Sequence, residues 1–128
     1  MRKKSPPFKP DESTLQSQIV ELLSRLADKG RFSFFSVPNE NKFLSLLPKN
    51  IAIAITNKLK AMGMVPGAAD LCVVQDGRIY FMEVKTEKGR QSANQKLFQT
   101  AMIEVGAKYI LVRSVNEALL ALKFWNII

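Results

Sequence analysis

Residues 66–85 have the sequence PGAADLCVVQDGRIYFMEVK, and the architecture of the whole chain is built around them. Two segments rich in β-branched and aromatic residues, 69–75 and 78–85, flank the dipeptide Asp76-Gly77. Asp-Gly between two such segments is a strong signal for a two-residue hairpin turn. The stretch therefore predicts two antiparallel strands joined by a tight turn.

The register of this hairpin brings two acidic residues together. If Gln75 pairs with Arg78 across the turn, Asp70 lies opposite Glu83. Directly opposed residues share a face of the sheet, with Cβ atoms roughly 4.5–5.5 Å apart. Two carboxylates at that separation repel each other unless a cation lies between them. We therefore expect Asp70 and Glu83 to hold a divalent metal, with the backbone carbonyl of Val84 as a further oxygen ligand.

A lysine completes this arrangement. Side chains alternate between the two faces of a strand, so Lys85 points to the same side as Glu83. A metal held by the acids would polarise a phosphate and activate a water, and Lys85 would orient that water or offset negative charge. The alternative is an ordinary ion pair, which is costly beside apolar neighbours such as Ile79 and Phe81. We interpret Asp70, Glu83 and Lys85 as the catalytic residues of a phosphodiester-cleaving site.

Two further polar residues each have two interpretations. Gln95 follows Ser92 at the spacing of a capping box, in which its side chain bonds to the backbone near Ser92. Alternatively, its amide lies beside Lys85 and takes part in catalysis. Glu12 lies in the first turn of a predicted helix, where its charge suits the helix dipole. It also shares the core-facing stripe of Leu15, from which it can reach the metal as an additional acid.

The composition is that of a folded domain with a polyanionic partner. The 128 residues are 47% hydrophobic, which suits one domain with a real core, residues 11–128. Residues 1–10 hold four cations and three prolines and are expected to form a flexible basic arm. No apolar run approaches the roughly 20 residues that cross a bilayer, and the N-terminus lacks a secretory signal.

The charged and metal-binding residue types narrow the function further. Lysine and arginine number 19 against 11 acids, and the net charge of +8 favours nucleic acid as the partner. Histidine is absent, which excludes Ser-His-Asp triads and most zinc sites, so a metal would be bound by oxygen as Mg²⁺ or Mn²⁺ are. The single cysteine, Cys72, excludes an internal disulfide and fits a reducing intracellular setting.

Cations also surround the predicted site. Their usual meaning is a solvated surface, and the more specific interpretation is contact with DNA phosphates, for which the loop directly after Lys85 is favoured. The candidates are Lys58, Lys60, Lys88, Arg90 and Lys96.

Hydrophobic periodicity and capping signals predict the remaining elements. Helices are expected from Asp11 to Gly30, from Pro48 to Gly63, from Ser92 to Val105 and around 117–122, and further strands at 31–37 and 109–112. The aromatic residues of the 31–37 strand and the apolar tail 124–128 are expected to be buried. The fold class is thus α/β, in the order α-β-α-β-β-α-β-α, with helices covering both faces of a small mixed sheet.

These motifs resemble a known family. Asp70, Glu83, Val84 and Lys85 stand in the motif positions of the PD-(D/E)XK nuclease superfamily. The wider arrangement, over about residues 11–124, resembles a VRR-NUC domain, the virus-type replication-repair nuclease. The residues that carry it are Glu12 with Gln16, Pro38-Asn39, Lys58-Leu59-Lys60 with Gly63, residues 66–71, residues 83–86 and residues 92–95. Glu40 and Ala69 depart from the family pattern, which affects loop shape rather than the catalytic atoms.

The resemblance implies a restriction-endonuclease-like core and Mg²⁺- or Mn²⁺-dependent cleavage of DNA. It implies catalysis by Asp70, Glu83 and Lys85, supported by Gln95 and Glu12. Stand-alone members are similar to phage and bacterial Holliday-junction resolvases that act as homodimers. We expect such a homodimeric endonuclease, in a bacterial or phage-infected cytoplasm, with an interface at Phe124 and Trp125 or in the 43–47 segment. The alternatives are a flap or single-strand nuclease, and a non-catalytic DNA-binding protein with a vestigial site.

Overall fold

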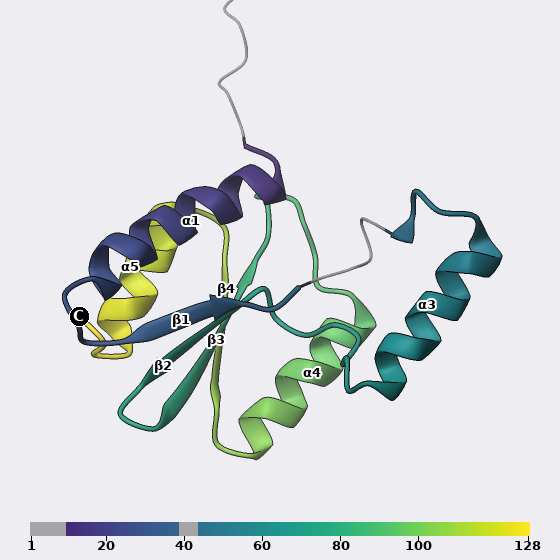
Figure 1. Ribbon diagram of the computed structural model, residues 1–128. Helices are drawn as coiled ribbons and strands as arrows, with labels where there is room; N and C mark the ends of the chain where they lie inside the picture. The colour runs from purple at the N-terminus through teal and green to yellow at the C-terminus, as the bar shows by residue number, and fades with distance from the viewer. Residues whose placement is uncertain (1–9, 39–43) are drawn as a thin grey trace, which may run out of the picture.

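The computed structural model describes residues 10–38 and 44–128. The elements follow the predicted order α-β-α-β-β-α-β-α (Figure 1). They are α1 (Glu12–Ala27), β1 (Ser33–Ser36), α3 (Lys49–Ala61), β2 (Leu71–Gln75), β3 (Arg78–Val84), α4 (Ala93–Glu104), β4 (Lys108–Val112) and α5 (Val115–Phe124). The predicted basic arm, apart from Pro10, and the predicted loop after Pro38, including Glu40, lie outside the described residues, as does Phe43.

The four strands form one mixed sheet in the order β1-β2-β3-β4. β2 runs antiparallel to both β1 and β3, whereas β4 runs parallel to β3 and needs the α4 crossover to reach its place. Asp76 and Gly77 have φ angles of 50° and 73°, the left-handed values of the hairpin turn that favours Asp-Gly. The register pairs Gln75 with Arg78, as predicted, and continues to Leu71 with Met82.

Helices pack on both faces of this sheet, and they divide its side chains between two environments. Helices α1 and α5 cover one face, where Leu23, Met82 and Leu122 are completely buried (Figure 1). Helix α4 lies on the other face, where the Phe98 ring packs against Phe81 with centroids 5.0 Å apart. Because strand residues alternate, the odd-numbered positions of β3 face α4 rather than the main core.

Helix α1 begins as predicted and ends earlier. The Asp11 carboxylate accepts a hydrogen bond from the Thr14 amide at 2.7 Å and caps the helix. The helix stops at Ala27, with Asp28 at the C-cap, so the predicted end at Gly30 was wrong. Gly30, with φ of 79°, closes the following turn by donating its amide to the Ala27 carbonyl at 2.8 Å.

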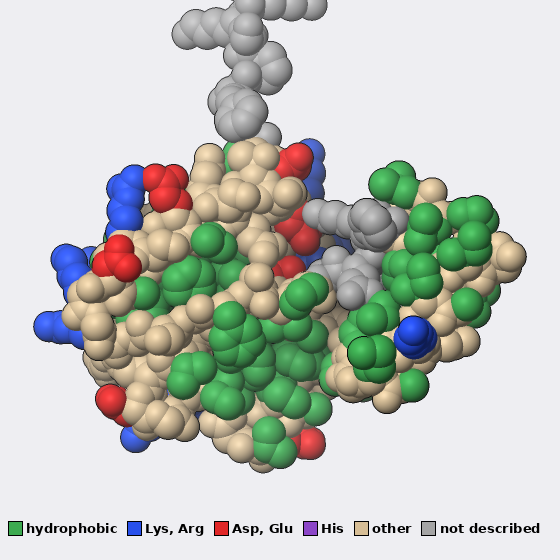
Figure 2. Space-filling model, in the orientation of Figure 1, with side chains coloured by type: hydrophobic (Ala, Val, Ile, Leu, Met, Phe, Trp, Pro, Cys, Tyr) green, Lys and Arg blue, Asp and Glu red, His purple; other side chains and the backbone are tan. Residues whose placement is uncertain are grey.

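Helix α3 forms where its periodicity predicts it but covers neither face of the sheet. None of its residues is buried, and Ile51, Ile53 and Ile55 are all exposed. Figure 1 shows the helix set apart from the sheet, and Figure 2 shows hydrophobic side chains over its surface. A spacing of three and four residues predicts an apolar stripe, but it does not specify what the stripe packs against.

The aromatic segment 31–37 and the C-terminal tail 124–128 each contain both buried and exposed apolar side chains. Phe32 is buried, but Phe35 is 55% exposed on the edge strand β1, so its predicted burial was wrong. In the tail, Trp125 packs on Tyr80 with ring centroids 4.9 Å apart, while Phe124 is 80% exposed. Within the described ranges, no helix has the length and apolar character to span a bilayer.

Candidate active site

Asp70 lies where the main-chain pairing of β2 with β3 stops. Its carbonyl accepts a hydrogen bond from the Val37 amide at 2.8 Å, which fixes its backbone to the chain just after β1. Its carboxylate oxygen Oδ2 accepts a hydrogen bond from the Val84 amide at 2.7 Å. The Asp70 side chain therefore accepts the hydrogen bond that a backbone carbonyl of the neighbouring strand would otherwise accept. Together, the backbone and side-chain hydrogen bonds hold the buried carboxylate in one orientation.

Three acidic side chains converge at this end of the sheet. Glu12, Asp70 and Glu83 each offer one carboxylate oxygen, and these three oxygens lie within 4.8 Å of one another. Glu12 reaches the site from the first turn of α1, and Glu83 from the next-to-last position of β3, at the end away from the hairpin turn. The hairpin register explains why two of the acids meet, and the docking of α1 on the sheet supplies the third.

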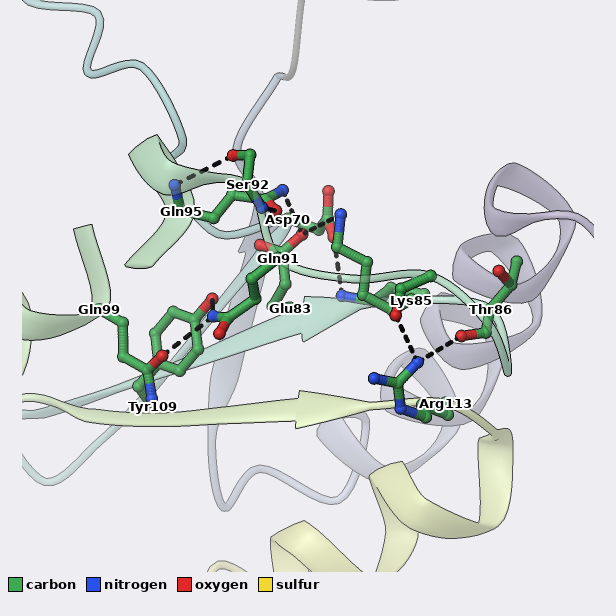
Figure 3. Close-up of polar contacts among 12 residues, drawn as sticks. Asp70, Glu83, Lys85, Thr86, Gln91, Ser92, Gln95, Gln99, Tyr109 and Arg113 are labelled. Atoms are coloured by element: carbon green, nitrogen blue, oxygen red, sulfur yellow. Dashed lines mark hydrogen bonds and ion pairs between the residues drawn. The ribbon is translucent and has the colours of Figure 1, made fainter. Parts of the chain in front are cut away.

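The two oxygens of Glu83 have different surroundings (Figure 3). Oε1 accepts a hydrogen bond from Gln95 Nε2 at 3.0 Å and lies 3.9 Å from the Lys85 ammonium nitrogen. Oε2 is buried and receives a hydrogen bond from no donor among the described residues. A buried carboxylate oxygen without a donor is costly, so this oxygen is suited to a proton or a metal cation.

The electrostatics of Glu83 follow from that position. Burial, followed by the neighbouring Asp70 carboxylate, raises the pKa of Glu83 to about 9, and the Lys85 ammonium group lowers it by less than these two effects raise it. Without a cation, Glu83 accordingly keeps its proton at neutral pH. A divalent cation would take the place of that proton.

Gln95 caps α4 as the first interpretation predicts, and its side chain also contacts Glu83. The Gln95 side-chain oxygen Oε1 accepts a hydrogen bond from the backbone amide of Ser92 at 2.8 Å. Its backbone amide donates to Ser92 Oγ at 3.2 Å, which completes the capping box. The other end of the same side chain donates to Glu83. An amide group has a donor end and an acceptor end, so the cap of α4 and the orientation of Glu83 depend on one residue.

A loop packed on the start of α4 completes the support of this cluster. Gly67 has a φ of 80°, and a Cβ placed on it would lie 2.4 Å from the carbonyl carbon of Asn94 and 2.6 Å from the Gln95 nitrogen. The backbone before Asp70 therefore lies directly against the first turn of α4. The Pro66-Gly67 dipeptide predicts a turn, but its contact with α4 is visible only in the folded chain.

The predicted DNA-contacting cations are all exposed on the surface. Lys88 and Arg90 are exposed in the loop that follows Lys85, and Lys96 is exposed on α4. Lys58 and Lys60 are exposed on α3, which lies away from the sheet (Figure 1). A hollow of about 200 Å³ opens beside the acids and is lined by Glu12, Ser13, Gln16, Ser36, Val37, Pro38 and Asp70.

A polar network on the other side of Glu83 has no signal in the sequence. Gln91 Nε2 donates to Gln99 Oε1 at 2.9 Å and to the Tyr109 hydroxyl at 3.0 Å (Figure 3). Burial, followed by the Glu83 charge, raises the pKa of Tyr109 to about 12, so the phenol stays protonated. Gln91 lies in a polar loop and Tyr109 in an aromatic strand, and neither pattern marks such a contact.

The chain is an α/β protein with a mixed four-stranded sheet, helices on both faces and acidic residues at one end. Comparison with protein families and with curated proteins finds no match for the sequence. A solved structure described as "VRR_NUC domain" matches with a TM-score of 0.58 and 20% identity, covering 89% of this chain and 96% of the other. The chain therefore has the fold of a VRR_NUC domain, as the resemblance implied.

Proposed function

We propose that this chain is a metal-dependent endonuclease that hydrolyses phosphodiester bonds in DNA. The observation that carries the proposal is the buried Glu83 carboxylate, which meets Asp70 and Glu12 and lies beside the Lys85 ammonium group. Its Oε2 receives a hydrogen bond from no donor among the described residues. An acidic cluster of this kind next to a cation is suited to a phosphate. The likeness to a VRR_NUC domain supports the same class of enzyme.

Asp70 and Glu83 would hold the metal, with Glu12 as a third carboxylate and the Val84 carbonyl as a further oxygen. This donor set fits Mg²⁺ or Mn²⁺, which prefer carboxylate and carbonyl oxygens. When bound, such a cation supplies a Lewis acid that polarises a phosphoryl oxygen and favours an ionised water. The Val84 amide and the Gln95 amide hold the two carboxylates in place beforehand.

Lys85 and Gln95 would act on the reacting groups through charge and orientation. The Lys85 side chain is only 11% exposed, so its ammonium group acts where water screens it little. There it would offset the negative charge that grows on the phosphate, or orient the attacking water. Gln95 keeps Oε1 of Glu83 occupied, which leaves Oε2 for the cation.

DNA in a branched form is the substrate that we propose. The net charge of +8 attracts a polyanion, and exposed cations near the site would bind its phosphates. They are Lys58, Lys60, Lys88, Arg90 and Lys96. The domain would span 11–128 after a basic arm at 1–10, in the cytoplasm of a bacterial or phage-infected cell. Resolution of a four-way junction is the specific activity that the VRR-NUC resemblance suggests.

A homodimer would suit that activity, because paired cuts on opposite strands call for two active sites related by a two-fold axis. The exposed apolar stripe of α3, with Ile51 and Ile55 one turn apart, is the surface that we propose for the dimer. Leu46 and Phe124 are exposed as well and remain compatible with the predicted interfaces. Trp125 packs on Tyr80 and is less accessible to a partner.

Cleavage assays on several DNA structures test the proposal. The chain is expected to cut a four-way junction in Mg²⁺ or Mn²⁺, and Asp70→Ala and Lys85→Ala are expected to lower the rate by about 100-fold or more. Preferential cutting of flaps or single strands would support the alternative nuclease. Binding of the junction without any cleavage would identify a DNA-binding protein with a vestigial site, and unchanged cleavage by both variants would refute the assigned residues.

A further inference from the structure

One guanidinium group organises the loop that directly follows Lys85. Nη1 of Arg113 donates to the carbonyl oxygen of Thr86 at 2.6 Å (Figure 3). It also donates to the carbonyl oxygens of Glu87 and Gly89, at 3.2 and 2.7 Å. This nitrogen carries two hydrogens, so the three acceptors share them. Arg113 follows β4 directly, and β4 is itself paired with β3. The 86–89 loop is therefore tied to the end of the neighbouring strand β4.

On one side of this loop, hydrogen bonds from Arg113 take the place of close packing. A cavity of about 350 Å³ lies beneath it, lined by Pro10, Leu15, Thr86, Glu87, Lys88 and Arg113. Apolar contacts that fill a space would otherwise limit the movement of a loop. Beside this cavity, the three hydrogen bonds from the Arg113 guanidinium group are among the described contacts that hold the loop in its conformation.

The same loop lies against the side chain of Lys85. A Cβ placed on Gly89 would lie 3.4 Å from Lys85 Cδ and 3.2 Å from Thr86 Oγ1, so the backbone of Gly89 packs closely on both. The loop also carries Lys88, and Arg90 follows it, both exposed to solvent. Its conformation thus fixes where two surface cations lie relative to the buried ammonium group.

We propose that Arg113 is a positioning residue for the binding of DNA phosphates. It holds the 86–89 loop so that Lys88 and Arg90 present their charges to the phosphate backbone beside Lys85. Nη1 of Arg113 is directed to loop carbonyls, so Arg113 acts through the loop rather than through the DNA. The inference rests on the proposed function, since it concerns how the same site holds its substrate.

Kinetics on a four-way junction separate this role from general stabilisation. Arg113→Gln is expected to raise KM about 10-fold and to keep kcat within about 3-fold of the wild-type value. It is also expected to reduce the slope of log K against log[salt] for junction binding by the amount that about 1 to 2 phosphate contacts contribute. Arg113→Lys keeps the charge but not the planar fork, and is expected to raise KM as well. Arg25→Gln removes the same charge from an exposed position on α1 and is expected to change neither quantity.

Fluorescence anisotropy with the uncleaved junction in Ca²⁺ or EDTA gives the second readout, and it does not require cleavage. The losses in affinity from Arg113→Gln and from Lys88→Gln combined with Arg90→Gln are expected to be non-additive, because they act on one set of phosphate contacts. Additive losses would overturn the proposal in favour of direct contact between Arg113 and DNA. A lower melting temperature with unchanged affinity and salt dependence would overturn it in favour of a purely structural role.

The outcomes also separate this inference from the proposed function. Wild-type protein that binds the junction but does not cut it would refute the nuclease and leave the anisotropy test valid. Wild-type protein that cuts the junction, with affinity indifferent to Arg113, would refute only the positioning role. Protein that neither binds nor cuts would refute both.

Discussion

Glu83 shows how one side chain can serve both the fold and the site. Its Oε1 is held by Gln95 and lies near Lys85, whereas its Oε2 has no donor among the described residues. A carboxylate kept only for stability would have both oxygens satisfied, because an unsatisfied buried oxygen lowers the free energy of unfolding. This loss in the free energy of unfolding is explained if Oε2 is the atom that binds a ligand.

The raised pKa of Glu83 predicts how the stability of the metal-free protein depends on pH. The unfolded chain ionises Glu83 near its ordinary pKa of 4.5, but the folded chain keeps the proton up to about 9. Between those values the folded state binds more protons, so the free energy of unfolding falls as pH rises, by up to about 1.4 kcal/mol per pH unit. The chain has no histidine, so few other side chains titrate between pH 5 and 8.

Urea unfolding in EDTA between pH 5 and 8.5 measures this dependence. Glu83→Gln is expected to reduce the slope and to be more stable than wild type at pH 8, because the amide does not ionise. Glu104→Gln, at an exposed position on α4, is the matched control and is expected to keep the wild-type slope. Equal slopes for wild type and Glu83→Gln would contradict the account of Glu83.

Among the elements, the β2–β3 hairpin could be predicted almost completely from the sequence. Asp76-Gly77 fixes the turn, the turn fixes the register, and the register places Asp70 against Glu83. All of these relationships are local, within about fifteen residues. The contacts that hold the site from outside the hairpin, such as Gly67 on α4 and Arg113 on the 86–89 loop, depend on how separate elements dock. No spacing in the sequence encodes them.

Gly67→Ala tests whether the close approach of the 64–70 loop to α4 supports the site. The new Cβ would overlap the backbone of Asn94 and Gln95, so α4 would have to shift and draw the Gln95 side chain away from Glu83. Gly63→Ala is the control, because Gly63 also has a positive φ but a Cβ there meets nothing within 4 Å. Both variants carry backbone strain of about 1 kcal/mol.

Thermal unfolding and Mn²⁺ affinity distinguish the two variants. Gly67→Ala is expected to lose about 1–3 kcal/mol more than Gly63→Ala, from overlap with backbone atoms that cannot rotate away. It is also expected to weaken Mn²⁺ binding, whereas Gly63→Ala retains it. Equal losses of stability and equal Mn²⁺ affinities would mean that the 64–70 loop does not hold α4 against the site.

On the scale of the whole molecule, the sequence predicted the order of the helices and strands better than it predicted which apolar side chains are exposed. The order of elements and the mixed sheet are confirmed. The apolar periodicity of α3 predicted a helix, but Ile51 and Ile55 lie on the outside of the molecule, and Phe35 is exposed as well. Burial depends on which surfaces meet in the complete fold, and periodicity alone cannot distinguish the core of one chain from an interface between two.

The proposed dimer predicts a specific effect of changes on α3. Light scattering at micromolar concentration is expected to give a dimer for wild type and a monomer for the double variant Ile51→Gln, Ile55→Gln. Glutamine keeps helix propensity and adds no charge, so melting temperature and Mn²⁺ affinity per chain should be retained. Leu120→Gln, on an exposed position of α5, is the control and is expected to stay dimeric. A wild type that is only monomeric would refute the dimer.

Isothermal titration of the protein with Mn²⁺ tests the central claim most directly, since it measures whether the acidic cluster holds a cation. Wild type is expected to bind at least one Mn²⁺ per chain and to release protons as it does so, and Asp70→Asn and Glu83→Gln are expected to abolish that binding. Wild-type protein without measurable affinity, or variants with wild-type affinity, would contradict the assignment of Glu12, Asp70 and Glu83 as a metal site.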